Sequence, residues 1–271
     1  MREQAYAKVN LALHVRGREP DGYHRLETLF AFCEDGDTLS VGPGEGLSLA
    51  VAGPFAAALG DDPDNLVLRA ARALATRFGV SAGAALHLDK RLPVASGIGG
   101  GSADAAAALR LLSRWWGLDA SEAVLLGIAA GLGADVPACV RSETVRGEGR
   151  GDRLVPQPDP ALAGAPLFLV NPRVPVPTGP VFAGWDGVDR GPLADIHSGR
   201  NDLEAPAVAV APVIRDVLSA LRAQAGTRLV RMSGSGATCF ALFADEAARD
   251  AATAALAGAH PDWWLLPTRL R

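Results

Sequence analysis

The first clear hydrophobic pattern in the chain is an alternation from Ala5 to Val15, in which every second residue is apolar. A period of two places successive side chains on opposite faces, so this segment predicts a β-strand. Short apolar stretches at 38–41, 47–51 and 84–88 also favour strands. The N-terminal part of the chain is therefore expected to be rich in sheet.

The apolar spacing changes to that of a helix in three places. Over residues 64–78 the apolar side chains fall on one stripe, with Asp64 or Asn65 as a candidate N-cap. From Ser102 onward the run ADAAAALRLLSRWW is rich in Ala and Leu and has no β-branched residue, which predicts a buried helix. A third helix is expected over residues 121–130.

The second half of the chain has a different order of elements. It follows a proline-rich passage, PQPDPALAGAP at 156–166, which we interpret as a linker. The expected order of strand, two helices, two strands, helix and strand is typical of a split β-α-β sandwich. The predicted domains are residues 1–157 and 158–271. The predicted elements of the second domain are strand 166–171, helices 201–208 and 212–223, strands 228–232 and 238–244, helix 245–257 and strand 263–267.

Composition places the chain among ordinary globular proteins, since 49% of its 271 residues are hydrophobic and 21% are charged. A formal charge of −4 gives no broad basic surface, which argues against nucleic acid or an anionic membrane as a main partner. Cys33, Cys139 and Cys239 lie far apart without metal-ligand spacing, which favours free thiols. No N-terminal targeting segment or long apolar run is evident, so we expect a cytoplasmic protein.

Two glycine clusters are candidate binding loops. The segment RLPVASGIGGG at 91–101 precedes the helix expected from Ser102, and its proline and four glycines argue against regular structure. The first N–H groups of a helix have no partner within it, so a glycine loop there can hold a phosphate. Ser102 could cap the helix, or bind a phosphate oxygen or Mg²⁺. A tight strand-to-helix turn is the alternative, because the loop has neither the lysine of a Walker loop nor the third glycine of a dinucleotide fingerprint. The cluster MSGSGATCF at 232–240 predicts a hairpin turn or a further binding loop.

Three other positions carry candidate chemistry, and each has a structural alternative. Lys8 and Asn10 lie on one face of the first strand, which predicts a polar site or a solvated strand edge. Asp135, in GLGADVPAC, could take a proton from an attacking hydroxyl or cap a short turn. Tyr23 and His24 follow an Asp-Gly turn, where they could grip a planar ring or begin a strand.

Taken together, these segments resemble the GHMP kinase family in order and spacing. The resemblance covers nearly the whole chain, and six short motifs in sequence make it more specific than any one of them. The segments that carry it are AYAKVNLALHV at 5–15, DGYHRLETLF at 21–30, PDNLVLRA at 63–70, LPVASGIGGGSADAA at 92–106, GLGADVPACV at 131–140 and MSGSGATCF at 232–240.

The resemblance implies an α+β protein with a two-domain GHMP kinase fold. The N-terminal domain would be ribosomal-protein-S5-domain-2-like and the C-terminal domain ferredoxin-like, with ATP and a small-molecule substrate in the cleft between them. The DGYH and GLGADVP segments resemble family members that phosphorylate the 2-hydroxyl of a cytidine diphosphate-linked methylerythritol in non-mevalonate isoprenoid biosynthesis. Another small-molecule GHMP kinase, or a nucleotide sensor without catalysis, is the alternative. The protein is expected to be a monomer or a homodimer.

The same resemblance assigns roles to individual residues. It implies Lys8 and Asp135 as the catalytic pair, and Ser102 as the hydroxyl nearest to Mg²⁺. Ala95, Ser96 and Ala103 depart from the common family pattern. The residues implied at ATP are Asn65, Pro93, Val94, Ala95, Ser96, Gly97, Ile98, Gly99, Gly100, Gly101 and Ser102. The residues implied at the substrate are Asn10, Tyr23, His24, Lys90, Thr178, Phe182, Gly234, Ser235 and Gly236.

Overall fold

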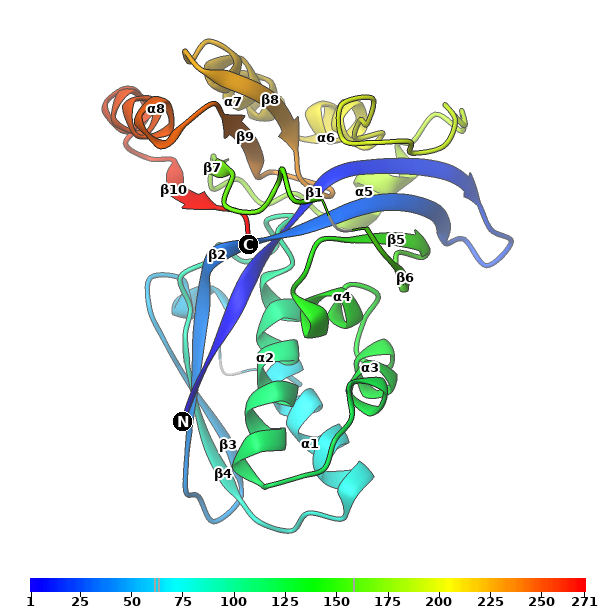
Figure 1. Ribbon diagram of the computed structural model, residues 1–271, viewed down its shortest axis with the longest axis vertical. Coiled ribbons are helices and arrows are strands. Elements are labelled where there is room, and N and C mark those ends of the chain that lie inside the picture. Colours follow the sequence, from blue (N-terminus) through cyan, green and yellow to red (C-terminus); the bar gives the residue numbers. More distant parts are fainter. Residues whose placement is uncertain (61, 63, 158) are drawn as a thin grey trace. The chain divides into compact units, whose positions relative to one another are not determined.

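The computed structural model describes residues 1–60, 62, 64–157 and 159–271. These residues form an α+β fold that divides into two compact units (Figure 1). Strands β1 (Arg2–Arg18) and β2 (His24–Gly42) contribute residues to both, so each unit is assembled from separate stretches of the chain. Unit 1 comprises Met1–Ala7, Asp35–Val94 and Gly99–Ser142, and unit 2 comprises Lys8–Glu34, Ala95–Ile98 and Glu143–Arg271.

The domain boundary expected after residue 157 stays a prediction. Pro158, the first residue of the expected second domain, lies outside the described residues, as does Pro63 of the segment 63–70. Within the part of the chain that the structure describes, no helix is both long enough and apolar enough to cross a membrane.

Unit 1 combines a small sheet with a group of helices, α1 (Leu66–Phe78), α2 (Gly100–Trp115), α3 (Glu122–Ala130), α4 (Val136–Arg141) and the short 3₁₀ helix η1 (Ala56–Ala58). Strand β3 (Leu47–Ala52) pairs in parallel with β4 (Ala84–Asp89), and β4 pairs antiparallel with residues 38–42 of β2. Helix α2 packs against α1 and α4, and α3 packs against α4 (Figure 1). The strands and the three longer helices confirm the predicted elements of this part of the chain.

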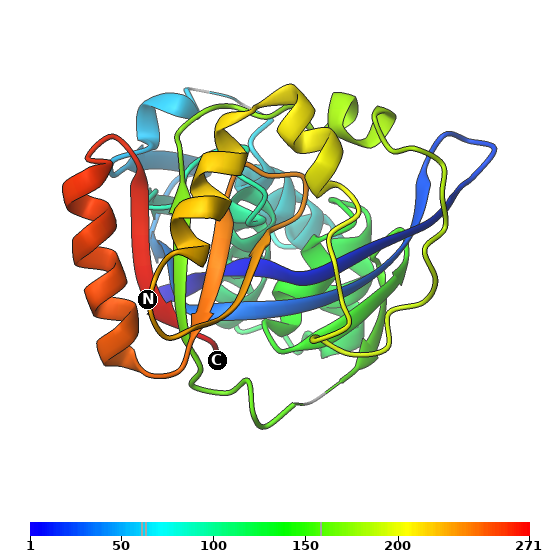
Figure 2. The ribbon, with the colours of Figure 1, turned by 90° about the horizontal axis from the view of Figure 1, so that it is seen from above.

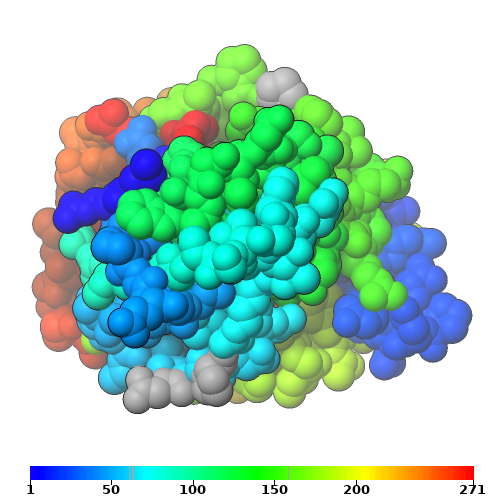
Figure 3. All heavy atoms as spheres, turned by 90° about the horizontal axis from the view of Figure 1, so that it is seen from below, coloured from blue at the N-terminus to red at the C-terminus, as the bar shows by residue number. Residues whose placement is uncertain are grey.

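Helix α1 begins and ends where the sequence predicts. Asn65 is its N-cap, and its Oδ1 accepts a hydrogen bond of 2.9 Å from the N–H of Val67. Gly79 ends the helix in the left-handed conformation that glycine adopts without strain. Leu74 is buried, whereas Arg77 is exposed on the outer side of the helix, which forms part of the surface in Figure 3 (cyan).

Helix α2 begins at Gly100, two residues before the predicted start. Its N-cap is Gly99, which has a φ of 63°. Glycine adopts this left-handed conformation without strain, whereas a residue with a side chain would be disfavoured there. The prediction that Ser102 caps the helix is wrong, because Ser102 is the third residue of α2. The prediction of irregular structure is also wrong for Gly100 and Gly101. The Ala- and Leu-rich part of the helix is buried, as predicted.

Unit 2 contains a four-stranded antiparallel sheet of order β10-β7-β9-β8. This is the arrangement expected for a split β-α-β domain. Helices α7 and α8 pack with side chains of one face of β7 and β9 in a common core, so both helices cover the same face of the sheet (Figure 2). The elements are β7 (Pro166–Asn171), α6 (Glu204–Val210), α7 (Val213–Arg222), β8 (Thr227–Met232), β9 (Cys239–Phe243), α8 (Glu246–Ala259) and β10 (Trp264–Arg269).

Three elements of unit 2 have no counterpart among the predicted ones: β5 (Val145–Gly149), β6 (Arg153–Pro156) and α5 (Thr178–Ala183). Each is short, and glycine, proline or charged residues interrupt its apolar pattern. Residues 26–30 of β2 pair with β5, and β5 pairs with β6. Strand β2 is also much longer than the segment predicted at 38–41, because it begins at His24. Pairing with neighbouring strands, rather than local propensity, forms these strands.

Candidate functional site

The first half of the predicted phosphate loop, residues 95–98, belongs to unit 2, where backbone hydrogen bonds hold it from two sides. The N–H of Lys8 donates to the carbonyl of Ile98 at 3.0 Å, and the N–H of Thr238 donates to the carbonyl of Ser96 at 3.1 Å. The loop therefore lies directly beside β1 and the second glycine cluster. Ala95 has a φ of 51°, a left-handed conformation that is easier for glycine, which fits the departure noted at this position.

Ser233 joins the same three segments through its side chain, and sequence reasoning did not single it out. Its Oγ accepts a hydrogen bond of 3.0 Å from the N–H of Asn10 and donates one of 2.9 Å to the carbonyl of Gly97. A Cβ atom on Gly97 would lie 2.5 Å from the carbonyl oxygen of Ser233. The backbones thus approach more closely than any side chain at position 97 would permit. The only hint in the sequence is that Ser233 lies within the glycine cluster 232–240.

Lys8 and Asn10 form a buried polar group on β1. Each side chain is 3% exposed, so the alternative of a solvated strand edge is wrong. The Nζ of Lys8 donates to Oδ1 of Asn10 at 2.8 Å and lies 5.0 Å from the ring centroid of Phe30. The amide of Asn10 in turn donates to Oγ1 of Thr28 at 2.8 Å. This network orients the ammonium and stabilises its charge within unit 2.

The structure brings together His24 and Phe182, two of the residues predicted to bind the substrate. The ring centroids of His24 and Phe182 are 5.0 Å apart, and Trp185, which sequence reasoning missed, lies edge-on to His24 at 5.7 Å. Burial, with a smaller contribution from the charge of Arg18, lowers the pKa of His24. His24 is the first residue of β2, so the alternative that it begins a strand is confirmed, while its contact with a ligand ring stays a prediction. The three rings form a cluster that could present flat faces to an aromatic ligand.

Tyr23 lies in a different environment from His24. Its side chain is 57% exposed, and the guanidinium of Arg150 lies 3.9 Å from its ring centroid. Arg150 is also paired with Asp21, the first residue of the Asp-Gly turn. The structure therefore adds a cation at the ring that the sequence identified.

The second glycine cluster forms the turn between β8 and β9, which confirms the predicted hairpin. Asn201 holds this turn, because its Nδ2 donates to the carbonyls of Met232 at 2.7 Å and Gly234 at 2.8 Å. At the surface, the hydroxyls of Ser235 and Thr178 lie 3.1 Å apart, so two predicted substrate residues are neighbours. Asn201 is a positioning residue that no sequence motif had indicated.

In unit 1, the predicted residues Ser102, Asp135 and Asn65 all lie at the starts of helices. Ser102 is half-buried in the first turn of α2. Asp135 occupies the N-cap position of α4, yet among the described residues its side chain accepts no capping hydrogen bond. The alternative that the carboxylate of Asp135 caps a turn is therefore wrong, although the residue does occupy the N-cap position. The Oδ1 atom of Asn65 is engaged in capping α1.

Lys90 differs from its predicted place at a substrate, because its side chain is 1% exposed and its ammonium lies between two carboxylates. Its Nζ is 2.6 Å from Oδ2 of Asp37 and 2.7 Å from Oδ2 of Asp104. Burial alone would lower the pKa of Lys90, but the charges of Asp104 and Asp37 outweigh it and raise the pKa. Burial raises the pKa of Asp104 to about 7. These distances argue against direct substrate contact by Lys90.

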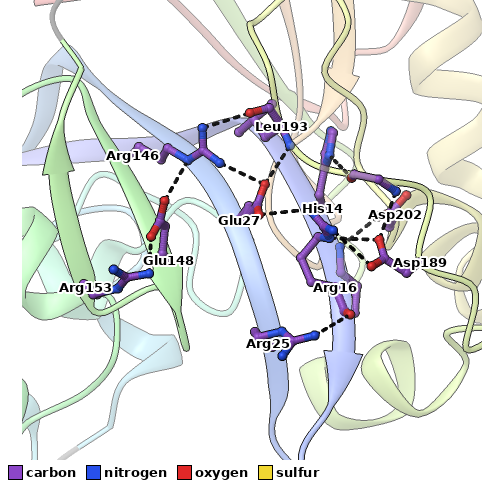
Figure 4. A network of polar contacts seen from close by, with 12 residues as sticks. His14, Arg16, Arg25, Glu27, Arg146, Glu148, Arg153, Asp189, Leu193 and Asp202 are labelled. Atoms are coloured by element: carbon purple, nitrogen blue, oxygen red, sulfur yellow. Dashed lines mark hydrogen bonds and ion pairs between the residues drawn. The ribbon is translucent and has the colours of Figure 1, made fainter.

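A cavity of about 250 Å³ lies in unit 2, and Figure 4 shows the charged groups around it. Glu27 accepts hydrogen bonds from Arg16 and Arg146, each at 2.9 Å, and from the N–H of Leu193 at 2.7 Å. Two ion pairs lie within the lining, Arg16 with Glu27 and Arg153 with Glu148. The network fixes the β1–β2 hairpin that carries Tyr23 and His24. The lining residues are Arg16, Arg25, Leu26, Glu27, Glu148, Gly149 and Arg153.

The part of the chain that the structure describes contains no metal site made by protein side chains alone. Across the described ranges, no three His, Cys, Asp or Glu side chains are grouped so as to hold a metal ion. Mg²⁺ in phosphate-transferring proteins usually keeps several waters and takes only one or two protein ligands in addition to substrate phosphates. The hydroxyl of Ser102 fits such a limited role.

Comparison with known proteins agrees with the fold and with the motifs. Residues 65–143 match the family described as GHMP kinases N terminal domain, and residues 189–262 match GHMP kinases C terminal. The chain is 62% identical to the 4-diphosphocytidyl-2-C-methyl-D-erythritol kinase of Rhizorhabdus wittichii, over 99% of this chain and 94% of that one. It is 51% identical to the protein of the same name from Sphingopyxis alaskensis, over 100% and 99% of the two chains. A crystal structure of 4-(cytidine 5'-diphospho)-2C-methyl-D-erythritol kinase superposes with a TM-score of 0.84 at 34% identity, covering 99% of both chains. This chain therefore belongs to the GHMP kinases and, within them, to the 4-diphosphocytidyl-2-C-methyl-D-erythritol kinases.

Proposed function

We propose that this protein transfers the γ-phosphate of ATP to the 2-hydroxyl of 4-diphosphocytidyl-2-C-methyl-D-erythritol. The observation that carries the proposal is the 62% identity, over 99% of the chain, to a relative named for that activity. The ring cluster of His24, Phe182 and Trp185 supports it, since a cytosine ring offers flat faces for stacking. Mevalonate and homoserine, the substrates of related kinases, have no such ring.

In the proposed reaction, Asp135 is the general base and Lys8 is the assisting cation. Asp135 accepts the proton of the 2-hydroxyl while that oxygen bonds to the γ-phosphorus and the bond from phosphorus to ADP breaks. Lys8 offsets the negative charge that develops during transfer. The motifs that carry the family resemblance support both assignments.

The remaining site residues are assigned either to ATP or to the cytidine-linked substrate. We propose that residues 93–98 and 99–102 contact the phosphates of ATP, with Asn65 on the adenine side. For the cytidine-linked substrate we propose Asn10, Tyr23, His24, Thr178 and Phe182 together with Gly234, Ser235 and Gly236. Lys90 is not included, because its ammonium is buried between two carboxylates.

Mg²⁺ is the metal that we propose for this reaction. When bound to the ATP phosphates it neutralises part of their charge, and Ser102 is the side chain that would hold it. We further propose that the protein is a monomer or a homodimer in the cytoplasm. The three cysteines are buried, and their wide spacing in the sequence favours thiols, as is usual in a reducing compartment.

An Asp135→Asn substitution tests the catalytic assignment. We expect kcat to fall about 10²- to 10⁴-fold, the range usual for loss of a general base, while ATP binding and the melting temperature stay near those of the unmodified protein. Asp119→Asn, at an exposed position in the same unit, is the matched control. Near-normal turnover by a folded Asp135→Asn protein would refute the role of Asp135 as base.

Substrate-dependent ADP release tests the function itself. We expect turnover with 4-diphosphocytidyl-2-C-methyl-D-erythritol and none with mevalonate or homoserine. Turnover of one of the smaller alcohols alone would identify another small-molecule kinase. Nucleotide binding without ADP release from any alcohol would instead favour a nucleotide sensor.

A further inference from the structure

Three ionisable side chains form a buried triad in unit 1, namely Asp37, Lys90 and Asp104. Their exposed fractions are 0%, 1% and 2%. The Nζ atom of Lys90 lies 2.6 Å from Asp37 and 2.7 Å from Asp104. Removing three charges from water is so unfavourable that apolar residues of similar volume often give equal or greater stability. The triad therefore needs an explanation beyond its contribution to the stability of the fold.

Asp37 connects the triad to the segment that leads into the phosphate loop. Its second oxygen, Oδ1, accepts hydrogen bonds from the backbone N–H of Arg91 at 2.5 Å and of Leu92 at 2.8 Å. These residues follow β4, whose last residue, Asp89, pairs with Thr38 of β2. Asp37 thus fixes the backbone at the exact point where the chain leaves the sheet.

Asp104 connects the triad to the other side of the loop. It is the fifth residue of α2, so its bond to Lys90 holds the first turns of that helix. Gly100, the first residue of α2, lies directly over the ammonium, because a Cβ atom there would be 3.0 Å from Nζ of Lys90 and 3.8 Å from Cβ of Leu92. The start of α2 therefore rests on the triad.

The charge of the triad also suits this place. An isolated ammonium beneath the first turn of a helix would oppose the partial positive charge of the helix N-terminus. The two flanking acids offset the charge of the ammonium and hold it at one position. The N–H groups at the start of α2 are then fixed in direction without a cation that competes with them.

We propose that the Asp37–Lys90–Asp104 triad positions the start of α2 for the nucleotide phosphates by tying residues 90–92 to Asp104. This inference rests on the proposed function, since it requires that residues 99–102 bind phosphate. Lys90 is in this view a positioning residue and touches no ligand. Its effect is on nucleotide affinity and on the alignment of the transferred phosphate.

The test compares two substitutions of Asp104. Asp104→Asn keeps an oxygen that can accept from Lys90, whereas Asp104→Leu removes the bond and leaves Lys90 paired with Asp37. For Asp104→Leu we expect the Kd of a non-hydrolysable ATP analogue to rise at least tenfold and kcat to fall, with the KM of the cytidine-linked substrate changed less than threefold. For Asp104→Asn we expect all three values within threefold of the unmodified protein. Asp104→Ser, whose side chain is too short to reach the ammonium, replaces the leucine variant if that protein does not fold.

The matched control is Glu3→Gln, which weakens two other ion pairs of α2, those of Glu3 with Arg110 and with Arg114. Both pairs are more than one helical turn from the start of α2, so we expect a lower melting temperature with unchanged analogue affinity. Unchanged affinity and kcat in a folded Asp104→Leu protein would show that the triad is only structural. If the unmodified protein binds no ATP analogue, the proposed function fails. If the unmodified protein binds the analogue and Asp104→Leu has the same affinity and kcat, only the positioning inference is overturned.

Discussion

Replacement of Gly97 by alanine gives the sharpest test of how the phosphate loop is held. Gly97 has a φ of 79°, and a Cβ atom there would lie 2.5 Å from the carbonyl oxygen of Ser233 and 2.8 Å from that of Gly236. All of these atoms belong to unit 2. The left-handed backbone conformation costs an alanine about 1–2 kcal/mol, and displacing packed backbone costs about 1–3 kcal/mol more. We therefore expect Gly97→Ala to lower the free energy of unfolding by about 2–5 kcal/mol.

Gly101→Ala is the matched control, because it adds the same methyl group four residues later. Gly101 is helical, and among the described residues a Cβ atom there would meet Cδ1 of Leu66 at an ordinary contact distance of 3.5 Å. Alanine is preferred over glycine in a helix by up to about 1 kcal/mol, so this protein should be as stable as the parent or slightly more stable.

Thermal unfolding of the two variants measures the difference. In a protein of this size each kcal/mol shifts the melting temperature by about 2–4 °C, so Gly97→Ala should melt at least about 4 °C below the parent and Gly101→Ala at or above it. The steric reasoning is refuted if Gly97→Ala melts with the parent, or if Gly101→Ala is destabilised equally. Nucleotide affinity is not the readout here, because a methyl group at either position could also meet a phosphate.

Three further predictions concern unit 2. Burial lowers the pKa of His14 and His24, so these two side chains reduce the free energy of unfolding as the pH falls from 7 to 5, whereas Asp104, whose pKa burial raises to about 7, acts in the opposite direction. In urea titrations, His14→Gln should therefore lose less stability than the parent between pH 7 and pH 5, and an equal loss in the two proteins would contradict the role of His14. Asn201→Ala removes two hydrogen bonds to the turn between β8 and β9 and should cost about 2–4 kcal/mol in the free energy of unfolding, whereas a loss below about 0.5 kcal/mol would contradict the role of Asn201 in holding that turn. Trp185→Ala should raise the KM of the cytidine-linked substrate about 3- to 30-fold and leave the KM of ATP unchanged. Equal changes in both KM values would contradict a contact between Trp185 and the cytosine ring.

The local sequence determined much of the secondary structure. The alternation from Ala5 to Val15 became β1, and Asn65 and Gly79 cap α1, because these signals act between residues close in the chain. The two glycine clusters were also recognisable, since glycine adopts the left-handed conformations found at Gly97 and Gly234 without strain and permits close backbone contacts there. The family resemblance came from the same motifs, and the comparisons confirmed it.

The tertiary structure decided how distant segments use their polar groups. Ser233 bonds to Asn10 and Gly97, which are more than a hundred residues away, and Lys90 pairs with Asp37 rather than lying at a substrate. Local sequence cannot reveal such partners, because the energy of a buried polar group depends on which atoms the fold places beside it. The sequence by itself therefore determined the elements, the glycine loops and the family. Only the folded chain decided that Ser233 and Asn201 hold those loops, and that Lys90 is enclosed beneath α2.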